Sequence, residues 1–298
     1  MRRSETGTTR PPSHAPAAPA DTPSTTRDPR TGALFTLTRY TRLTWQLSAV
    51  SVHRLTEYRM DFLLGAGGLL LRVICQIAVI GTVFRQVPVI AGWHYHQVLF
   101  LLGFSLLPRG LDRMFTDQLW ILARKLVQNG EFFRYLVRPV NPLFSLLSER
   151  FLYPDGFGEL ITGAALTWYA AAHLETGPST GQWLLSPLLV LCGTLILASI
   201  KTLFASLAFW TTNSLPALYA ANQLGEFSGY PLDLYHPSLR WLLTWLLPYA
   251  FTAYVPVSYL IFGHARMLPW LFVVTAALVT LALIVWHRGV DRYEMTGS

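Results

Sequence analysis

The sequence predicts an all-α fold: a polytopic helical membrane protein with six transmembrane helices and an N-terminal interfacial helix. Of its 298 residues, 52% are hydrophobic and only 13% are charged, whereas an average soluble domain has about 25% charged residues. Mean hydropathy is positive, at +0.37. So few charges cannot cover the surface of a soluble protein of this length. General disorder is also excluded, because it requires low hydrophobicity and high charge.

The first part of the chain is expected to lie outside the membrane core. Residues 1–32 are rich in Pro, Ala, Ser and Thr, and we expect a disordered cytoplasmic head because such a stretch buries too little apolar surface to fold. Residues 33–59 read as an amphipathic helix in which Arg39 and Arg42 flank the apolar Leu43. A basic helix of this kind, just before a span, lies on membrane lipids. A solvated helix is the alternative.

Residues 60–290 form the predicted six-span domain. A span needs about 20 apolar residues, at about 1.5 Å of rise each, to cross about 30 Å of hydrocarbon. Aromatic residues mark many ends of the apolar runs, as expected at a membrane interface. The six predicted spans are Asp61–Phe84, His94–Leu111, Gly156–His173, Leu184–Trp210, Leu239–Phe262 and Met267–His287.

Positive charge predicts the orientation of these spans. Residues 1–59 hold nine Arg and residues 109–150 hold seven basic residues, whereas residues 174–183 hold none. Six spans with both termini inside place the basic segments and the tail, residues 291–298, in the cytoplasm. The net charge of +7 therefore reflects topology, and no nucleic-acid partner is expected. Residues 211–238 carry no Lys or Arg, and their Pro and Gly leave a re-entrant segment as an alternative there.

The sequence lacks the common nucleotide-binding and catalytic motifs of enzymes. Lys125 and Lys201 are the only lysines and neither follows a glycine, so there is no P-loop for ATP. We therefore expect no catalytic residue, no metal site and no cofactor bound by this chain. Lys201 lies within the long fourth span, and we expect it to extend toward the cytoplasmic face.

Arg72 lies at the middle of the first predicted span. An Arg at the bilayer centre costs about 2.5–3.5 kcal/mol on insertion scales, so its side chain must face protein or water. Two interpretations remain open. Arg72 lines a translocation path or contacts an anionic substrate, or it forms an ion pair between helices with Glu159 of the third span.

The largest predicted cytoplasmic loop, residues 112–150, contains the motif NGEFFRYLVRPVNPL at residues 129–143. Its apolar residues recur at helical spacing while charged residues occupy the other sides, which predicts a charged amphipathic helix. Such a helix docks a partner protein or lies on lipid. The apolar residues are Phe133, Leu136, Val137 and Val140, and the charged ones are Glu131, Arg134 and Arg138.

This motif resembles the signature loop of type-2 ATP-binding-cassette (ABC) permeases, the small six-span membrane subunits of bacterial exporters. Residues 230–231, 247–251 and 255–256 are similar to the Tyr-Pro and Pro-Tyr-Ala-Phe pattern of that subgroup around its fifth span. Phe132 and Phe133 depart from the pattern, because the subgroup often has an acidic residue after the Gly-Glu pair.

The resemblance implies a permease subunit in the bacterial cytoplasmic membrane. It would dimerise with a second copy or a homologous permease and pair with separate ABC ATPase subunits that hydrolyse the ATP, so the chain itself would be no enzyme. The cytoplasmic loop would carry a coupling helix. Its docking residues would be Glu131, Arg134 and Arg138, with Pro139 ending the helix.

The same resemblance suggests where a substrate would pass. Arg72 and a fifth span kinked at Pro248 and Pro256 are the candidate walls of a translocation path. Two functions of other classes compete with transport. One is a membrane-embedded lipid-modifying enzyme, which would need polar catalytic groups gathered at one depth. The other is a non-transporting membrane scaffold.

Overall fold

The computed structural model describes residues 59–211 and 213–296, all within the second of the two units into which the chain divides, Leu43–Ser298. The predicted head, residues 1–32, and nearly all of the predicted interfacial helix, residues 33–59, lie outside the described residues. The helices and strands are α2 (Arg59–Gln86), β1 (Val89–Ile90), β2 (Trp93–His94), α3 (Tyr95–Thr116), α4 (Gln118–Ile121), α5 (Phe133–Leu136), α6 (Pro142–Ser148), α7 (Pro154–Ala172), α8 (Thr180–Ser206), α9 (Leu215–Gly225), α10 (Pro237–Trp241), α11 (Tyr254–Phe262) and α12 (Leu268–Thr296). Short π-helical turns follow α4 and α10, at Leu122–Leu126 and Leu242–Leu246.

The predicted fold class is confirmed, because the described chain is almost entirely helical and contains helices suited to a membrane. Three of these helices are long and apolar enough to cross a bilayer, namely Leu64–Gln86, Thr180–Phe209 and Ala265–Tyr293. Only 11% of the first and 17% of the last is buried within the protein, so both leave apolar surface for lipid or another subunit. The crossings predicted at His94–Leu111 and Gly156–His173 stay predictions.

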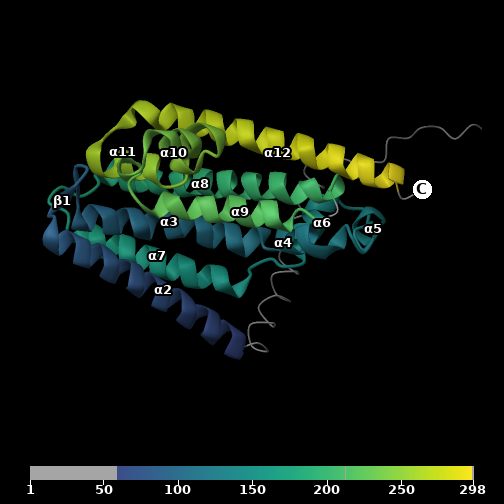
Figure 1. Ribbon diagram of the computed structural model, residues 1–298, viewed down its shortest axis with the longest axis horizontal. Coiled ribbons are helices and arrows are strands. Elements are labelled where there is room, and N and C mark those ends of the chain that lie inside the picture. Colours follow the sequence, from purple (N-terminus) through teal and green to yellow (C-terminus); the bar gives the residue numbers. More distant parts are fainter. Residues whose placement is uncertain (1–58, 212, 297–298) are drawn as a thin grey trace, which may run out of the picture. The chain divides into compact units, whose positions relative to one another are not determined.

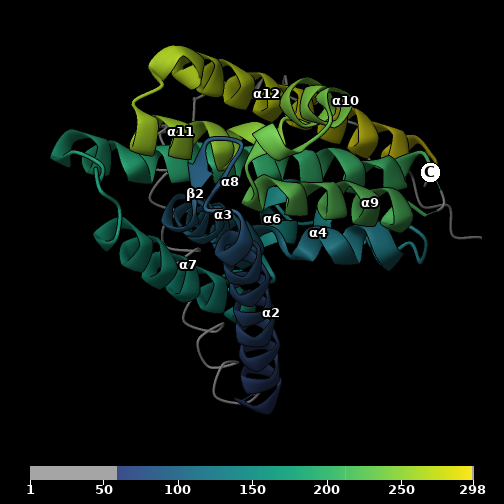
Figure 2. The same cartoon turned by 60° about the vertical axis from the view of Figure 1, so that its left-hand side comes forward.

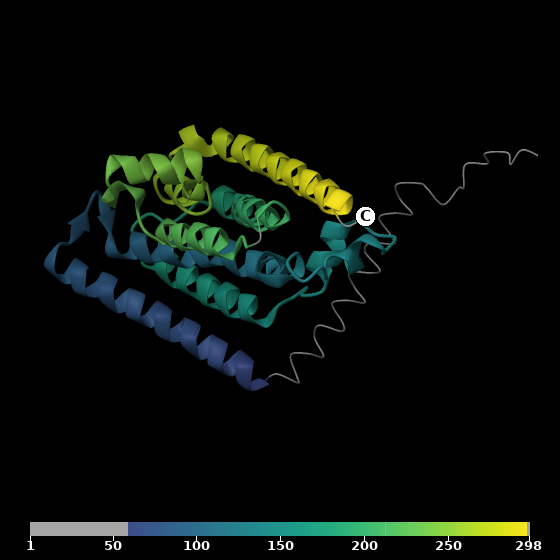
Figure 3. The same cartoon turned by 45° about the vertical axis from the view of Figure 1, so that its right-hand side comes forward.

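The bundle has two ends, which Figure 1 shows at its left and right. The hairpin end carries β1 and β2, which pair antiparallel through a turn with positive φ at Ala91 and Gly92, the backbone that a tight hairpin turn requires. The loop end carries α4, α5 and α6. Helix α3 runs from the hairpin end to the loop end, α7 returns beside it, and α8 runs to the loop end again. In Figures 2 and 3, α2 and α12 lie on opposite sides of these central helices.

Helices α3 and α7 pack closely because glycines face the contact. A Cβ at Gly103 would lie 2.6 Å from the backbone nitrogen of Thr167, and one at Gly163 would lie 2.8 Å from the Cβ of Leu106. Small residues let two membrane helices approach until their backbones touch, which adds van der Waals contact that lipid cannot replace. The sequence places both glycines within predicted spans.

We expect Gly103→Ala to destabilise the protein by about 1–3 kcal/mol, because the added methyl group would force α3 and α7 apart. The matched control is Gly67→Ala in α2, where a Cβ meets nothing within 4 Å. This control should be neutral or slightly stabilising, since Ala is the better helix former. Thermal unfolding of both variants in detergent checks the prediction, and equal melting temperatures would contradict it.

After α8 the chain runs once more along the bundle, from the loop end to the hairpin end. It begins at the loop end, where the hydroxyl of Ser214 donates to a carbonyl in the last turn of α8. It then follows α3, since Arg109 donates to the carbonyl of Gly225 at 2.9 Å. It reaches the hairpin end where the Trp93 indole donates to Asp233 at 3.2 Å. Residues 215–233 therefore run antiparallel to α3.

The prediction that Leu239–Phe262 forms a single crossing is wrong. The segment begins just after the chain has reached the hairpin end, and it ends there too, with the Phe262 ring 5.0 Å from the Trp93 ring. Between these points it dips into the bundle, where the Tyr249 hydroxyl donates to the carbonyl of Ala221 in α9 at 2.7 Å. Helices α10 and α11 are thus the two arms of a re-entrant hairpin (Figure 1). The re-entrant segment that was the alternative for residues 211–238 is not found there, since residues 215–233 run along α3 from one end to the other.

Candidate functional site

The motif of residues 129–143 folds into two short helices instead of one amphipathic helix. Helix α5 covers only Phe133–Leu136, because Pro139 disfavours helical backbone at the residue before it. Asn141 then starts α6, its side-chain oxygen accepting from the backbone N–H of Leu143 at 2.9 Å. Pro142 is the first residue of α6, a position where its missing N–H costs nothing. The prediction of a single helix across the motif is therefore wrong.

Phe132 anchors this loop to the helices of the bundle. Its side chain is fully buried, and its ring lies 5.0 Å from that of Phe209, 5.9 Å from Trp286 and 5.3 Å from Tyr293. Edge-to-face ring packing of this kind stabilises beyond simple area burial. Phe209 follows α8, and the other two residues belong to α12. Because α12 continues to Thr296, the predicted tail, residues 291–298, begins as helix and contributes to this contact.

Glu149 holds the two arms of the loop together. Its carboxylate accepts from the Tyr135 hydroxyl at 2.6 Å, from Gln118 at 2.9 Å and from Arg134 at 3.1 Å. It also forms an ion pair with Arg138 at 3.7 Å. Burial raises the pKa of Tyr135, which keeps its hydroxyl protonated as the donor. The sequence reasoning did not identify Glu149, since its partners lie 11 to 31 positions away and follow no helical spacing.

The predicted docking residues are partly engaged within the loop. Arg134 and Arg138 brace it through Glu149, although each is nearly half exposed. Glu131 accepts from the side chain of a neighbouring asparagine. The side chains that face outward without a comparable internal role are Phe133 and Val137, at 61% and 63% exposure. Four positions apart, these two lie on one face of the α5 turn.

We expect Glu149→Gln to loosen the loop. The neutral amide keeps the shape of the side chain but loses its charge-assisted bonds to Arg134 and Arg138, worth about 1.5–3 kcal/mol. Trypsin should then cleave after Arg134 about tenfold faster than in the wild type. Glu131→Gln, which changes the same charge at a carboxylate bonded only locally, should leave the cleavage rate unchanged. Equal cleavage rates in all three proteins would contradict the bracing role of Glu149.

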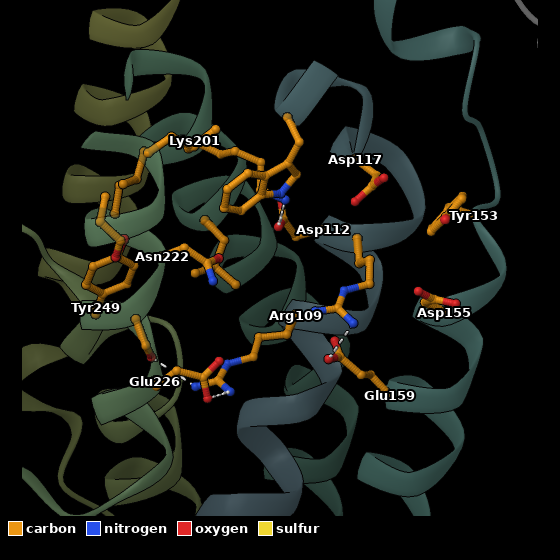
Figure 4. A pocket seen from close by; sticks show the side chains of 17 residues that line it. Arg109, Asp112, Asp117, Tyr153, Asp155, Glu159, Lys201, Asn222, Glu226 and Tyr249 are labelled. Carbon is orange, nitrogen blue, oxygen red and sulfur yellow. Dashed lines mark hydrogen bonds and ion pairs between the residues drawn. The ribbon is translucent and has the colours of Figure 1, made fainter. Parts of the chain in front are cut away.

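A charged pocket of about 350 Å³ lies between α3, α7, α8 and α9. Figure 4 shows acidic and basic side chains from these helices converging on it. Its lining carries five carboxylates and three cations, so its formal charge is −2. They are Asp112, Asp117, Asp155, Glu159 and Glu226, with Arg109, Arg113 and Lys201.

Lys201 lies inside the bundle, which makes the expectation that it extends toward the cytoplasmic face wrong. Its ammonium group pairs with Asp112 and donates to the Thr116 hydroxyl at 2.9 Å. Thr116 donates in turn to the Asp112 carboxylate at 2.6 Å. All three side chains are buried. The ion pair forms because a buried charge without a partner costs more than the ordering of two side chains.

Arg72 forms the predicted ion pair with Glu159, at 3.3 Å. Glu159 is 1% exposed and also pairs with Arg113 at 3.3 Å. Arg72 reaches Glu226 as well, at 3.7 Å, and Arg109 holds the other oxygen of that residue at 2.9 Å. Arg72 therefore links two acidic residues of the pocket lining. The inter-helix interpretation is confirmed, and the translocation-path interpretation remains compatible with it.

The two prolines of the predicted fifth span have different roles. Pro248 breaks the re-entrant hairpin and precedes Tyr249, whose side chain lines the pocket. Pro256 lies in the first turn of α11, where proline is tolerated without a kink. It is buried and is not part of the pocket lining. At Pro248 the segment is broken where a kink was predicted, and at Pro256 the predicted kink is absent.

These observations define the class of the protein as a helical membrane protein with a charged internal pocket and an anchored loop at one end. The chain matches the family model of the ABC-2 family transporter proteins over residues 70–297. It therefore belongs to the ABC-2 transporter family, and the family resemblance read from the loop motif is confirmed. The match includes both the loop and the pocket, and it identifies a membrane-embedded permease with a role in transport. Neither a curated protein nor a solved structure matches the chain.

Proposed function

We propose that this chain is the membrane-spanning permease subunit of an ABC exporter, moving a substrate across the cytoplasmic membrane with energy from a separate ATPase subunit. The observation that carries the proposal is the loop of residues 112–150, which presents an exposed apolar face and is fixed to α8 and α12 by Phe132. A chain without a P-loop needs a partner for ATP hydrolysis. This loop is the surface on which such a partner would act, and the chain itself would bind no cofactor.

The docking surface we propose combines the charged residues of the loop motif with the exposed apolar pair. Phe133 and Val137 would enter a depression on the ATPase, where full burial of each contributes about 1.5–3 kcal/mol. Arg134 and Arg138 lie next to them and would offer charge-assisted bonds at the rim. Glu131, which precedes α5, and Pro139, which follows it, would complete that rim.

Force on this loop has a physical route to the pocket. Glu149 holds the docking arm, and the next residue, Arg150, pairs with Asp117 at 3.0 Å. Asp117 lines the pocket. Closure of the ATPases on ATP would therefore shift the loop as a unit, and rigid movement of the attached helices would open the pocket to alternate sides.

The assembly we propose is a pair of permeases with ATPase subunits on the cytoplasmic side. The low burial of α2 and α12 leaves apolar faces that a second permease and membrane lipids would cover. The chain termini and the loop end would lie in the cytoplasm, in agreement with the concentration of Arg in those segments.

Co-expression with candidate P-loop ATPases from the same genome tests the proposal. The ATPase should copurify with the permease, and reconstitution in lipid vesicles should change its rate of ATP hydrolysis when a substrate is added. A scaffold would bind without any response to substrates. A lipid-modifying enzyme would convert vesicle lipids in the absence of ATPase and ATP, and either outcome would contradict the proposal.

A further inference from the structure

The cations that line the charged pocket are all engaged. Lys201 is held by Asp112. Arg113 is held by Glu159 at 3.3 Å. Arg109 donates to Glu226 and to two further oxygen atoms nearby. Because each of these cations is already neutralised by a carboxylate, the pocket attracts an anionic ligand less strongly than unpaired cations would.

Two carboxylates of the same lining have acceptor capacity to spare. Glu159 is 1% exposed, yet its Oε2 atom has no hydrogen-bond partner, while Oε1 takes both of its ion pairs. Asp155, one turn earlier on α7, makes no hydrogen bond or ion pair with any residue in the described part of the chain. Figure 4 shows both side chains extending from α7 toward the pocket. A buried acceptor without a donor is unusual and expensive.

We propose that this pocket binds an organic cation of the amine class, whose N–H groups donate to Glu159 and Asp155. Arg72 and Arg150 pair with three of the lining carboxylates from outside the pocket, whereas Asp155 keeps a negative charge that no ion pair compensates among the described residues, which favours a positive ligand. The indole of Trp120 provides an aromatic wall, which suits a cation. Arg72 and Arg113 next to Glu159 are 39% and 40% exposed, so a change of rotamer in either one admits the amine to the buried oxygen.

Other ligands fit this lining less well. A metal ion would need several ligands gathered around it, and no group of three or more His, Cys, Asp or Glu suited to a metal occurs within residues 59–211 and 213–296. A neutral polyol offers donors but gains nothing from the negative lining. The binding of an amine is inferred from the pocket alone. Only the step that makes this amine a transported substrate rests on the proposed function.

Calorimetry with spermidine tests the inference on the full chain in lipid nanodiscs, without ATPase and at constant ionic strength. We expect saturable binding by the wild type and about tenfold weaker binding by Asp155→Asn, which breaks no ion pair. Glu159→Gln should weaken binding at least as much. The matched control is Glu175→Gln, an exposed carboxylate between α7 and α8 at the hairpin end, which should leave binding unchanged. Thermal unfolding of each variant shows that it is folded.

The outcomes separate this inference from the proposed function. Absence of spermidine binding in the wild type would overturn it, as would equal binding by the wild type, Asp155→Asn and Glu159→Gln. Saturable binding of sucrose or inorganic phosphate in place of spermidine would also overturn it. If the ATPase copurifies and responds to another substrate while spermidine fails to bind, the proposed function stands and the amine inference fails. If spermidine binds but no ATPase copurifies, the amine inference stands and the proposed function fails.

Discussion

Replacing Phe133 and Val137 together by Asp releases the ATPase from the permease while the permease remains folded. Both side chains are more than 60% exposed, so the substitutions remove little packing within the chain. At the interface they would replace two buried apolar groups by two carboxylates, and a buried charge without a partner is strongly unfavourable. We expect the affinity for the ATPase to fall by about 100-fold or more. Titration of the reconstituted permease with labelled ATPase measures this.

A control for this double variant exists at the opposite end of the bundle. Val87 and Val89 are also exposed, at 48% and 44%. Val87 precedes β1 and Val89 is its first residue, so both lie at the hairpin end. Val87→Asp with Val89→Asp changes the net charge equally, and this variant should bind the ATPase like the wild type. Unchanged binding by the loop variant would contradict the docking assignment. Equal loss in both variants would point to a general effect of charge.

The second large effect is expected at the buried ion pair between Lys201 and Asp112. Lys201→Met removes the cation and leaves a carboxylate buried with only Thr116 to stabilise it. Breaking a buried pair in this way costs about 3–5 kcal/mol. The variant should melt at a clearly lower temperature and aggregate during purification, as measured by thermal unfolding and gel filtration in detergent.

Removing both charges of this pair should restore most of the lost stability. In Lys201→Met with Asp112→Asn, neither charge of this pair remains, so the double variant should melt closer to the wild type than Lys201→Met does. Asp112→Asn alone should be destabilised as well, because the ammonium group then lacks its counter-charge. If the double variant lost as much stability as the two single variants lose together, the ion pair would not be the source of the effect.

The ion pair between Arg72 and Glu159 shows what the sequence could predict. An Arg in the middle of an apolar span must find a partner, and the nearest acidic residue within another predicted span is a sound choice. The same reasoning failed for Lys201, which lies closer to the end of its helix. It was assigned to the membrane surface, although Asp112 and Thr116, four positions apart on α3, offer it an internal site. Their shared face is the signal that could have identified it.

The re-entrant hairpin could not be predicted from hydropathy. The run Leu239–Phe262 is long and apolar enough for a span, and only three-dimensional packing shows that both of its ends lie at the hairpin end. Hydropathy indicates whether a segment prefers lipid or water. It does not indicate whether the segment crosses the membrane or turns back. The break around Pro248 was the available local signal, and it was read as a kink because a kinked helix explains the same residue.

The loop motif identified the family but not the shape of the site. Its apolar spacing suggested a helix from Phe133 to Val140, yet Pro139 ends that pattern after one turn. Phe132 was noted as a departure from the subgroup, and the structure gives it the central buried position in the loop. The importance of Glu149 arises from folding, since its carboxylate meets its partners only when α4, α5 and α6 come together.

The most direct test of the central claim, that a separate ATPase acts on this permease through its loop, is site-specific photocrosslinking in native membranes. A photoreactive amino acid at Val137, and in a second protein at the exposed Trp168 of α7, reports which molecules touch each position. We predict that position 137 forms an adduct with the ATPase and that position 168 does not. Adducts of position 137 with lipid alone, or equal ATPase labelling from both positions, would contradict the account.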